Sequence, residues 1–382
     1  MILIKDILIA SVLLVTLFGC SNKKTDNSIV WLGEEVNICG ELIYWDPELL
    51  YGFANPIIVG DNYIVNQTSG NPNYRYSLLR WNRDSIICVT NFLALGRGPK
   101  EVLIPKAIKN LNLDSLIIYD NSNRNNKIIS IPLAGNLENL TRVDLWRERY
   151  VDYISDFDKI IVLDRKENLF LGMHTYSYGG NSRMYLIDLN RDEITPLNLY
   201  YPKDKSKTED NINNMLRYIA YSGIIEKHPS LDRFVYISES NLYMQIFNLD
   251  YENRQIDIVK EVHDYYPDYK MVERYGAPNV SFSSSSRFGF VQYYTTKNRI
   301  YLLMNDFTYA DVRKMSTING HSFSFSNNVY VYDWDGNHVK KLVLDEYIDT
   351  FFVDDEDQYL FGTTYSLDDP SYPVVGYRFK ID

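Results

Sequence analysis

The amino-acid sequence predicts an all-β protein with the architecture of a six-bladed β-propeller. The composition includes 33 Tyr, 17 Phe and 5 Trp, and aromatic side chains favour the pleated, half-buried surface of a sheet. Stretches of Glu, Ala, Leu and Lys, which favour helices, are nearly absent. Pairs of mostly apolar runs joined by polar turns also recur along the chain, so we expect one β-unit to be repeated.

The repeated unit is a β-hairpin, because its turns are rich in Asn and Asp, which tolerate the positive φ angles of tight turns. Each pair of runs is interpreted as the outer two strands of a blade. Five pairs occur, at residues 76–89, 115–131, 183–194, 242–259 and 329–344. Runs within residues 221–238 and 288–304 supply inner strands for the fourth and fifth pairs. Four strands in about 40 to 60 residues match a propeller blade.

The chain ends in an apolar run over residues 372–381 that has no hairpin partner. We expect residues 36–44 to pair with it, so that the N-terminal and C-terminal strands close the ring. This closure removes free sheet edges, which promote aggregation. Five hairpins and one closing pair predict six blades rather than seven. A pair of β-sandwiches and a β-solenoid are the alternative folds.

Length and charge agree with a repeat fold and narrow the possible partners. The 382 residues exceed what one hydrophobic core usually holds, so the chain is either multidomain or built from repeats. The net charge is −11, whereas a nucleic-acid binder needs a basic face that neutralises phosphates. We therefore expect no nucleic-acid partner.

The N-terminus predicts export and lipidation. Lys5 precedes a mostly apolar run over residues 7–18, and a Gly-Cys pair ending at Cys20 closes the run, which resembles a bacterial lipoprotein signal peptide. Cys20 is therefore the predicted lipidation site. The alternatives are an ordinary signal peptide and an N-terminal transmembrane helix. The apolar run is shorter than the about 20 residues that span a bilayer.

Three segments follow from this prediction: a signal peptide over residues 1–19, a flexible tether over residues 20–28 and a single propeller domain over residues 29–382. Acyl chains on Cys20 would anchor the domain to a membrane. Ser21, in place of Asp, generally favours the outer membrane in Gram-negative lipoproteins. No acidic cluster follows as a surface-export tag, so the domain is expected to face the periplasm.

The remaining cysteines and the densest acidic run predict no metal site and no cofactor. Cys39 and Cys88 form either a disulfide, which an exported protein permits, or two unpaired thiols. The sequence contains no CxxC motif and no Cys/His cluster of the kind that binds zinc. Residues 354–357 are four consecutive acidic residues without the alternation or the Gly of a calcium loop, so we interpret them as a solvated turn.

Two segments carry a resemblance to a known family. Residues 92–102 contain the sequence Gly-Arg-Gly-Pro-Lys-Glu, and residues 329–337 form a late hairpin with an Asp-Gly turn. With the repeat rhythm, they resemble the TolB-like six-bladed β-propeller lipoprotein family of Gram-negative bacteria. The chain has Lys100 where members usually have Gly. The resemblance implies a lipid-anchored propeller and carries over no catalytic residue.

The Gly-Arg-Gly-Pro loop suggests one candidate binding residue. Gly96 and Gly98 permit backbone angles that other residues avoid, and Pro99 fixes one φ angle, which suits a sharp connection between blades. Arg97 then either braces the loop through carbonyl groups or points toward the axis as an anion-binding group. Bracing is the favoured interpretation. No Gly-Lys-Ser/Thr follows, so the loop is not a phosphate-binding P-loop.

Tyrosines outside the predicted strands are the other candidate binding residues. Exposed aromatic side chains stack on sugars or contact partner proteins, although in so Tyr-rich a chain some fall in loops by chance. The candidates are Tyr176, Tyr178, Tyr265, Tyr266 and Tyr269.

The function predicted is that of a binding or scaffold module for a protein or glycan partner in the cell envelope, without catalysis. The sequence contains no G-x-S-x-G motif, and its His residues do not pair at metal-ligand spacing. The alternative is a hydrolase or lyase whose residues come from several blade loops around the central channel. Polar residues that converge on the axis would favour the enzyme, and an apolar or unmatched lining would favour the scaffold.

Overall fold

The computed structural model describes residues 33–68, 71–108, 114–122, 126–133, 135–151, 157–164, 168–174, 182–202, 214–240, 242–263, 268–274, 276–305, 307–314, 324–365 and 374–382. Trp31–Asp382 forms one compact unit. The predicted signal peptide, Cys20 and the tether lie outside the described residues. None of the helices in the described residues has the length and apolar character needed to cross a bilayer.

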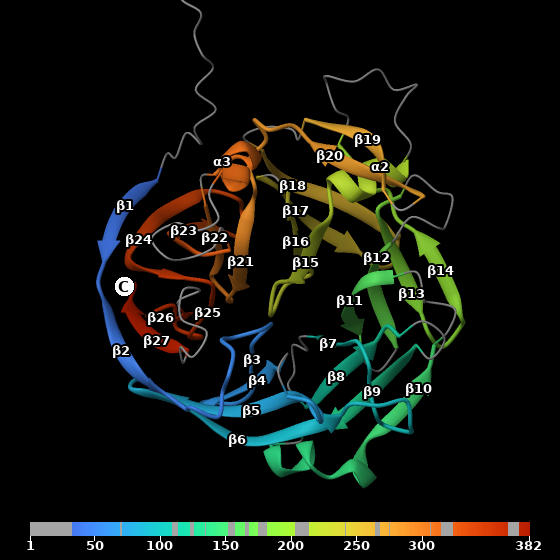
Figure 1. Ribbon diagram of the computed structural model, residues 1–382. Coiled ribbons are helices and arrows are strands. Elements are labelled where there is room, and N and C mark those ends of the chain that lie inside the picture. Colours follow the sequence, from blue (N-terminus) through green and yellow to red (C-terminus); the bar gives the residue numbers. More distant parts are fainter. Residues whose placement is uncertain are drawn as a thin grey trace, which may run out of the picture. The chain divides into compact units, whose positions relative to one another are not determined.

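Six antiparallel blades surround a central axis, which confirms the predicted propeller (Figure 1). Each blade begins with a strand beside the axis. These innermost strands are β3 (Ile57–Ile58), β7 (Pro105–Ile108), β11 (Phe157–Asp164), β15 (Gly223–Lys227), β21 (Phe290–Thr295) and β25 (Thr350–Val353).

The strands that follow lie successively farther from the axis. In blades 1 to 3 they are β4 (Tyr63–Gln67), β5 (Tyr74–Asn82) and β6 (Ser85–Ala94); β8 (Ser115–Asp120), β9 (Lys127–Pro132) and β10 (Arg147–Tyr150); and β12 (Leu169–His174), β13 (Met184–Asp188) and β14 (Glu193–Pro196). In blades 4 to 6 they are β16 (Arg233–Ser238), β17 (Tyr243–Asp250) and β18 (Gln255–His263); β22 (Arg299–Met304), β23 (Ser326–Asp333) and β24 (His338–Ile348); and β26 (Tyr359–Thr364) and β27 (Val375–Lys380).

The five predicted hairpins are present, but one of them occupies a different place in its blade. The pair at residues 115–131 forms the second and third strands of blade 2, β8 and β9, rather than its outer two. The outer strand is β10, whose sequence Arg-Glu-Arg-Tyr has no apolar alternation. It was missed because its pairing with β9, rather than burial of its side chains, makes it a strand.

The ring closes through the N-terminal strand, as predicted. Strand β2 (Gly40–Trp45) pairs antiparallel with β27 and completes blade 6. Strand β1 (Glu34–Ile38) pairs in parallel with β24, so it adds a fifth strand to blade 5. The end of β2 also forms a short parallel ladder with β6 of blade 1. One N-terminal segment therefore joins three consecutive blades.

Short elements lie outside the blades. They are the helices η1 (Leu137–Leu140), η2 (Val143–Leu145), α2 (Asn214–Ala220) and α3 (Tyr309–Lys314) and the hairpin of β19 (Tyr269–Arg274) and β20 (Ala277–Phe282). The hairpin packs against α2 (Figure 1).

Aromatic side chains fill the contacts between neighbouring blades. Trp81 of blade 1 packs edge-on against Phe352 and Phe361 of blade 6, with ring centroids 5.6 and 5.2 Å apart. The guanidinium of Arg183 in blade 3 lies 4.0 Å from the ring centroid of Tyr236 in blade 4. These contacts account for part of the unusual aromatic content, because each blade must pack against two flat neighbours.

Candidate functional site

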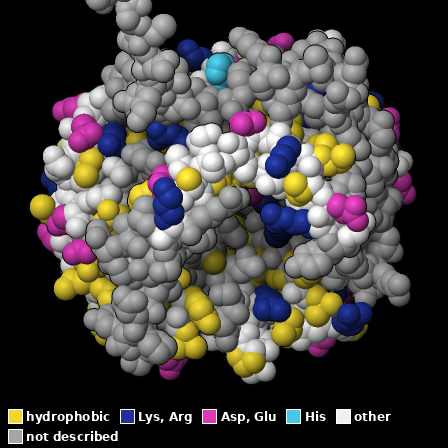
Figure 2. Space-filling model, turned by 45° about the horizontal axis from the view of Figure 1, so that its top comes forward, with side chains coloured by type: hydrophobic (Ala, Val, Ile, Leu, Met, Phe, Trp, Pro, Cys, Tyr) yellow, Lys and Arg dark blue, Asp and Glu magenta, His cyan; other side chains and the backbone are white. Residues whose placement is uncertain are grey.

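A cavity of about 710 Å³ lies among the innermost strands and is the principal candidate site. Its lining comes from β3, β7, β11, β15 and β21, and thus from blades 1 to 5. Residues 104–108 and 290–295 contribute two continuous stretches of this lining. Figure 2 shows the molecule hollowed near its centre, with basic and apolar side chains around the hollow. The cavity is therefore a place where residues far apart in the sequence meet.

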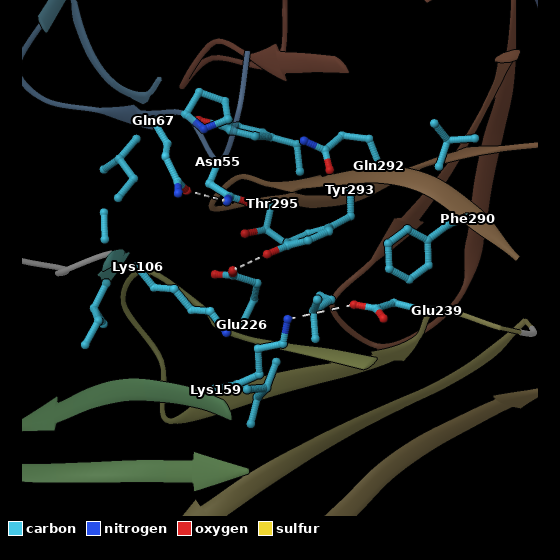
Figure 3. Close-up of a pocket in the computed structure, with 18 of the residues that line it drawn as sticks. Asn55, Gln67, Lys106, Lys159, Glu226, Glu239, Phe290, Gln292, Tyr293 and Thr295 are labelled. Carbon is cyan, nitrogen blue, oxygen red and sulfur yellow. Dashed lines mark hydrogen bonds and ion pairs between the residues drawn. The ribbon is translucent and has the colours of Figure 1, made fainter. Parts of the chain in front are cut away.

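Two amide side chains line the cavity where blade 1 borders it. Asn55 precedes β3 with φ at 47°, a left-handed conformation that Asn tolerates. Its Nδ2 donates a hydrogen bond to Gln67 Oε1 over 3.1 Å. Gln67 Nε2 donates in turn to the carbonyl oxygen of Pro105 over 3.4 Å, which connects blade 1 to blade 2. The amide pair is thereby held at the cavity (Figure 3).

A carboxylate and a phenol link blades 4 and 5 on the opposite wall. The Tyr293 hydroxyl of β21 donates a hydrogen bond to Glu226 Oε1 of β15 over 2.9 Å (Figure 3). Burial, and secondly the negative charge of Glu226, raise the pKa of Tyr293 well above its usual value. Tyr293 therefore stays protonated and acts as a donor at physiological pH.

Two lysines approach the cavity from neighbouring blades. Lys106 lies on β7 and Lys159 on β11, and both extend toward the interior in Figure 3. Lys159 Nζ lies 3.8 Å from Glu239 Oε1, with side chains 26% and 43% exposed. Glu239 also accepts a hydrogen bond from Ser222 Oγ over 3.3 Å. The ion pair thus links blades 3 and 4 at the cavity.

Strand β21 adds an apolar surface and a further amide. The rings of Phe290 and Tyr293 meet edge-on with centroids 5.9 Å apart. Between them in sequence, Gln292 lines the cavity, and its side-chain amide makes no hydrogen bond with the residues that the structure describes. The site combines amides, paired charges and an aromatic surface, which suits the recognition of a polar ligand.

Arg97 is exposed, and it is not among the residues that line this cavity. Its guanidinium makes no hydrogen bond or ion pair within the described part of the chain. The bracing expected of Arg97 comes from two other residues instead. Glu101 Oε2 accepts a hydrogen bond from the Gly98 backbone N–H over 2.7 Å, and Lys127 Nζ donates to the Gly98 carbonyl over 3.1 Å. Anion binding by Arg97 stays a prediction.

Of the candidate tyrosines, Tyr176, Tyr178, Tyr265 and Tyr266 lie outside the described residues. Tyr269 is the first residue of β19 and is only 4% exposed. Its ring packs against those of Tyr221 and Phe282, and the ring centroids lie 6.5 Å apart in each pair. The expectation that Tyr269 lies in an exposed loop is wrong, because its ring joins the apolar core that includes α2.

None of the residues that line the cavity was predicted from the sequence. Several of the polar ones lie in otherwise mostly apolar strands, such as Lys106 in Pro-Lys-Ala-Ile and Glu226 in Gly-Ile-Ile-Glu-Lys. The available signal was a charged side chain on an innermost strand. Using that signal required knowing which strands face the axis.

The structure also describes the two cysteines of the propeller domain and the acidic run at residues 354–357. Cys39 is exposed and Cys88 is partly buried, and both thiols are free. In the acidic run, Asp354 Oδ1 accepts a hydrogen bond from the Gln358 backbone N–H over 2.7 Å, and Asp357 accepts one from the Tyr301 hydroxyl over 2.9 Å. Among the described residues, no three His, Cys, Asp or Glu side chains lie together as metal ligands would.

Comparisons with known proteins identify relatives of this fold. The family model described as TolB-like 6-blade propeller-like matches residues 63–356. An exported protein from Bacteroides fragilis superposes with a TM-score of 0.49 at 10% identity, covering 91% of this chain and 99% of that one. No sequence match is found among curated proteins.

Two further solved structures are similar. A member of the DUF4221 family from Bacteroides vulgatus has a TM-score of 0.47 at 11% identity, covering 89% of this chain and 94% of that one. TolB from Acinetobacter baumannii has a TM-score of 0.39 at 13% identity, covering 84% of this chain and 63% of that one.

Proposed function

The chain belongs to the TolB-like 6-blade propeller-like family, and from this premise we propose that it is a binding module of the cell envelope. A partner protein or glycan would enter the axial cavity. The single observation that carries it is the cavity itself, which is about 710 Å³ in volume and lined from five blades. Ligand sites of about 300–1,000 Å³ with a few placed polar groups are typical of proteins.

The pairing of polar groups inside the cavity supports a binding role. Lys159 pairs with Glu239, and the Tyr293 hydroxyl donates to Glu226. These pairs hold each side chain in one orientation, which lowers the entropic cost of recognising a ligand.

The second candidate function is that of a hydrolase or lyase. The convergence of Lys106, Lys159 and Glu226 from three blades favours it, because charged groups gathered in one cavity are a common feature of active sites (Figure 3). The two functions differ in one measurable respect. An enzyme converts the captured partner into products, whereas a binding module releases it unchanged.

The location proposed for the module is the outer membrane, facing the periplasm, with Cys20 as its lipid anchor. The Gly-Cys pair after an apolar N-terminal run supports this proposal. Mass spectrometry of the mature protein tests it. We expect a new N-terminus at Cys20 bearing acyl chains and a Cys20→Ser variant without them. An unmodified Cys20 in the mature wild type would contradict the proposal.

Capture from solubilised envelopes tests the binding function. Gln292→Trp places a bulky indole inside the cavity, whereas the control Met271→Trp places the same indole on β19, at a position that is 65% exposed and outside the cavity. We expect wild type and Met271→Trp to retain the same proteins or glycans and Gln292→Trp to lose them. Identical captured material from all three would show that the cavity is not the binding site.

A further inference from the structure

We propose that the axial cavity binds a neutral, hydroxyl-rich ligand, namely the terminal sugar of a glycan. This inference rests on the binding function proposed above and names the chemistry of the ligand at the same site. It follows from three properties of the cavity: its charge balance, its amide groups and its aromatic surface.

Opposite charges balance one another around the cavity. Lys106 and Lys159 approach from blades 2 and 3, and Glu226 and Glu239 lie on blade 4 (Figure 3). Lys159 and Glu239 already form an ion pair at 3.8 Å. The two positive and two negative side chains cancel, so this set of groups offers no net attraction to a phosphate or carboxylate ligand. A neutral ligand needs no such attraction.

The amide side chains match hydroxyl groups. A hydroxyl both donates and accepts hydrogen bonds, and so does a primary amide. Gln292 has its whole amide available, since it makes no hydrogen bond with any described residue. Asn55 donates to Gln67 and keeps its Oδ1 as an acceptor at the same cavity. Asn55 lies just before β3 of blade 1 and Gln292 lies on β21 of blade 5, so the two amides can contact different sides of one sugar ring.

Phe290 supplies the apolar surface that a sugar also requires. Its ring is partly exposed in the cavity and is held edge-on against Tyr293 at 5.9 Å between centroids. One face of a sugar ring presents C–H groups, which pack against an aromatic surface while the hydroxyls bind polar groups. A wholly apolar ligand would instead remove the cavity's amides and charged groups from water without giving them partners, which is costly.

Saturation-transfer difference NMR with simple sugars tests the proposal. The probes are D-glucose, D-galactose, D-mannose and N-acetyl-D-glucosamine, each at millimolar concentration with the full-length mature protein. We expect at least one sugar to receive saturation from the wild type, with its C–H protons closest to the protein. Binding should change little between 50 and 500 mM NaCl, because screening acts on charged ligands. A sugar signal that falls steeply with added salt would contradict a neutral mode of recognition.

Variants of Gln292 locate the binding. Gln292→Trp should abolish the sugar signal, and Gln292→Ala should weaken affinity by roughly 3- to 10-fold, as expected for one lost hydrogen bond. Met271→Trp should bind as the wild type does. Unfolding curves for all variants verify that the fold is retained. A sugar signal that survives Gln292→Trp would overturn the inference.

Two further outcomes separate this inference from the proposed function. If none of the four sugars binds while envelope capture still depends on Gln292, the sugar inference is wrong and the binding function stands. If galacturonate or a lysine-containing peptide binds in the cavity and the neutral sugars do not, the cavity recognises charge and the inference is also wrong. If capture does not depend on Gln292 and no sugar binds, both proposals fail.

Discussion

Asp349 lies between β24 and β25 and is expected to make the stability of blade 6 depend on pH. Its Oδ1 accepts a hydrogen bond from Thr363 Oγ1 over 3.0 Å and a longer one from Thr350 Oγ1 over 3.4 Å. Burial raises the pKa of this carboxyl to about 6, although these hydrogen bonds act in the opposite direction. The perturbation we propose is Asp349→Asn, which keeps an acceptor and removes the charge.

The size of the effect follows from the shift in pKa. A pKa that lies about 2 above the ordinary value of an aspartate corresponds to about 3 kcal/mol of free energy between the protonated and charged forms. Because the folded state binds the proton more tightly than the unfolded state, the stability contributed by the protonated carboxyl is present below about pH 4. It is lost as the pH rises to about 6. At pH 7 the asparagine variant should therefore be more stable than the wild type by up to about 3 kcal/mol.

Urea unfolding between pH 4 and 8 measures the difference. We expect the stability gain of Asp349→Asn to grow from near zero at pH 4 to a plateau above pH 6.5. Asp61→Asn, at an exposed position, controls for the change in net charge. A stability difference between Asp349→Asn and the wild type that is constant over this range would refute the reasoning, since it would show that Asp349 titrates alike in the folded and unfolded states.

Three more variants test other contacts. Gly40→Val would place a Cβ 2.6 Å from the Phe379 ring at the closing strand pair, and should lower the free energy of unfolding by about 1–3 kcal/mol; an unchanged melting temperature would argue against close packing there. Lys127→Met removes the partner that lies 2.7 Å from Glu148, with side chains only 2% and 11% exposed, and should cost about 3–5 kcal/mol in chemical denaturation. Adding Glu148→Gln should recover part of that loss, and no recovery would mean that the ion pair is not its cause. Tyr293→Phe removes the 2.9 Å hydrogen bond to Glu226 and should cost about 1–3 kcal/mol; a smaller loss in the same assay would mean that water replaces the hydroxyl.

Local chemistry explains which parts of the fold were predictable. The turn after β23 has Gly336 at φ 78°, and Asp333 Oδ1 accepts backbone hydrogen bonds from Asp335 and Asn337 over 2.9 and 2.8 Å. These contacts form within five residues, so the Asp-Gly turn could be predicted from the local sequence. The outer strand β10 was not, because its Arg and Glu side chains give no apolar pattern.

The candidate site was predictable in its location but not in its residues. A propeller of six blades implies a central axis, and the lining of that axis comes from the first strand of each blade. Lys159 and Glu239 are 80 positions apart in the chain, yet their charged groups lie 3.8 Å from each other. No local pattern indicates such a pair, because the ring alone brings the two strands together.

The amino-acid sequence by itself was enough to predict the β-hairpins, the six blades and the pairing of the N-terminal and C-terminal strands. Turn residues and apolar alternation act over short stretches, and a last strand without a hairpin partner needs one from elsewhere in the chain. Only the tertiary structure decided which side chains meet at the axis, that Tyr269 is buried and that Glu101 and Lys127 brace the Gly98 loop. Those outcomes depend on how the blades pack against one another, and that packing is a property of the closed ring as a whole.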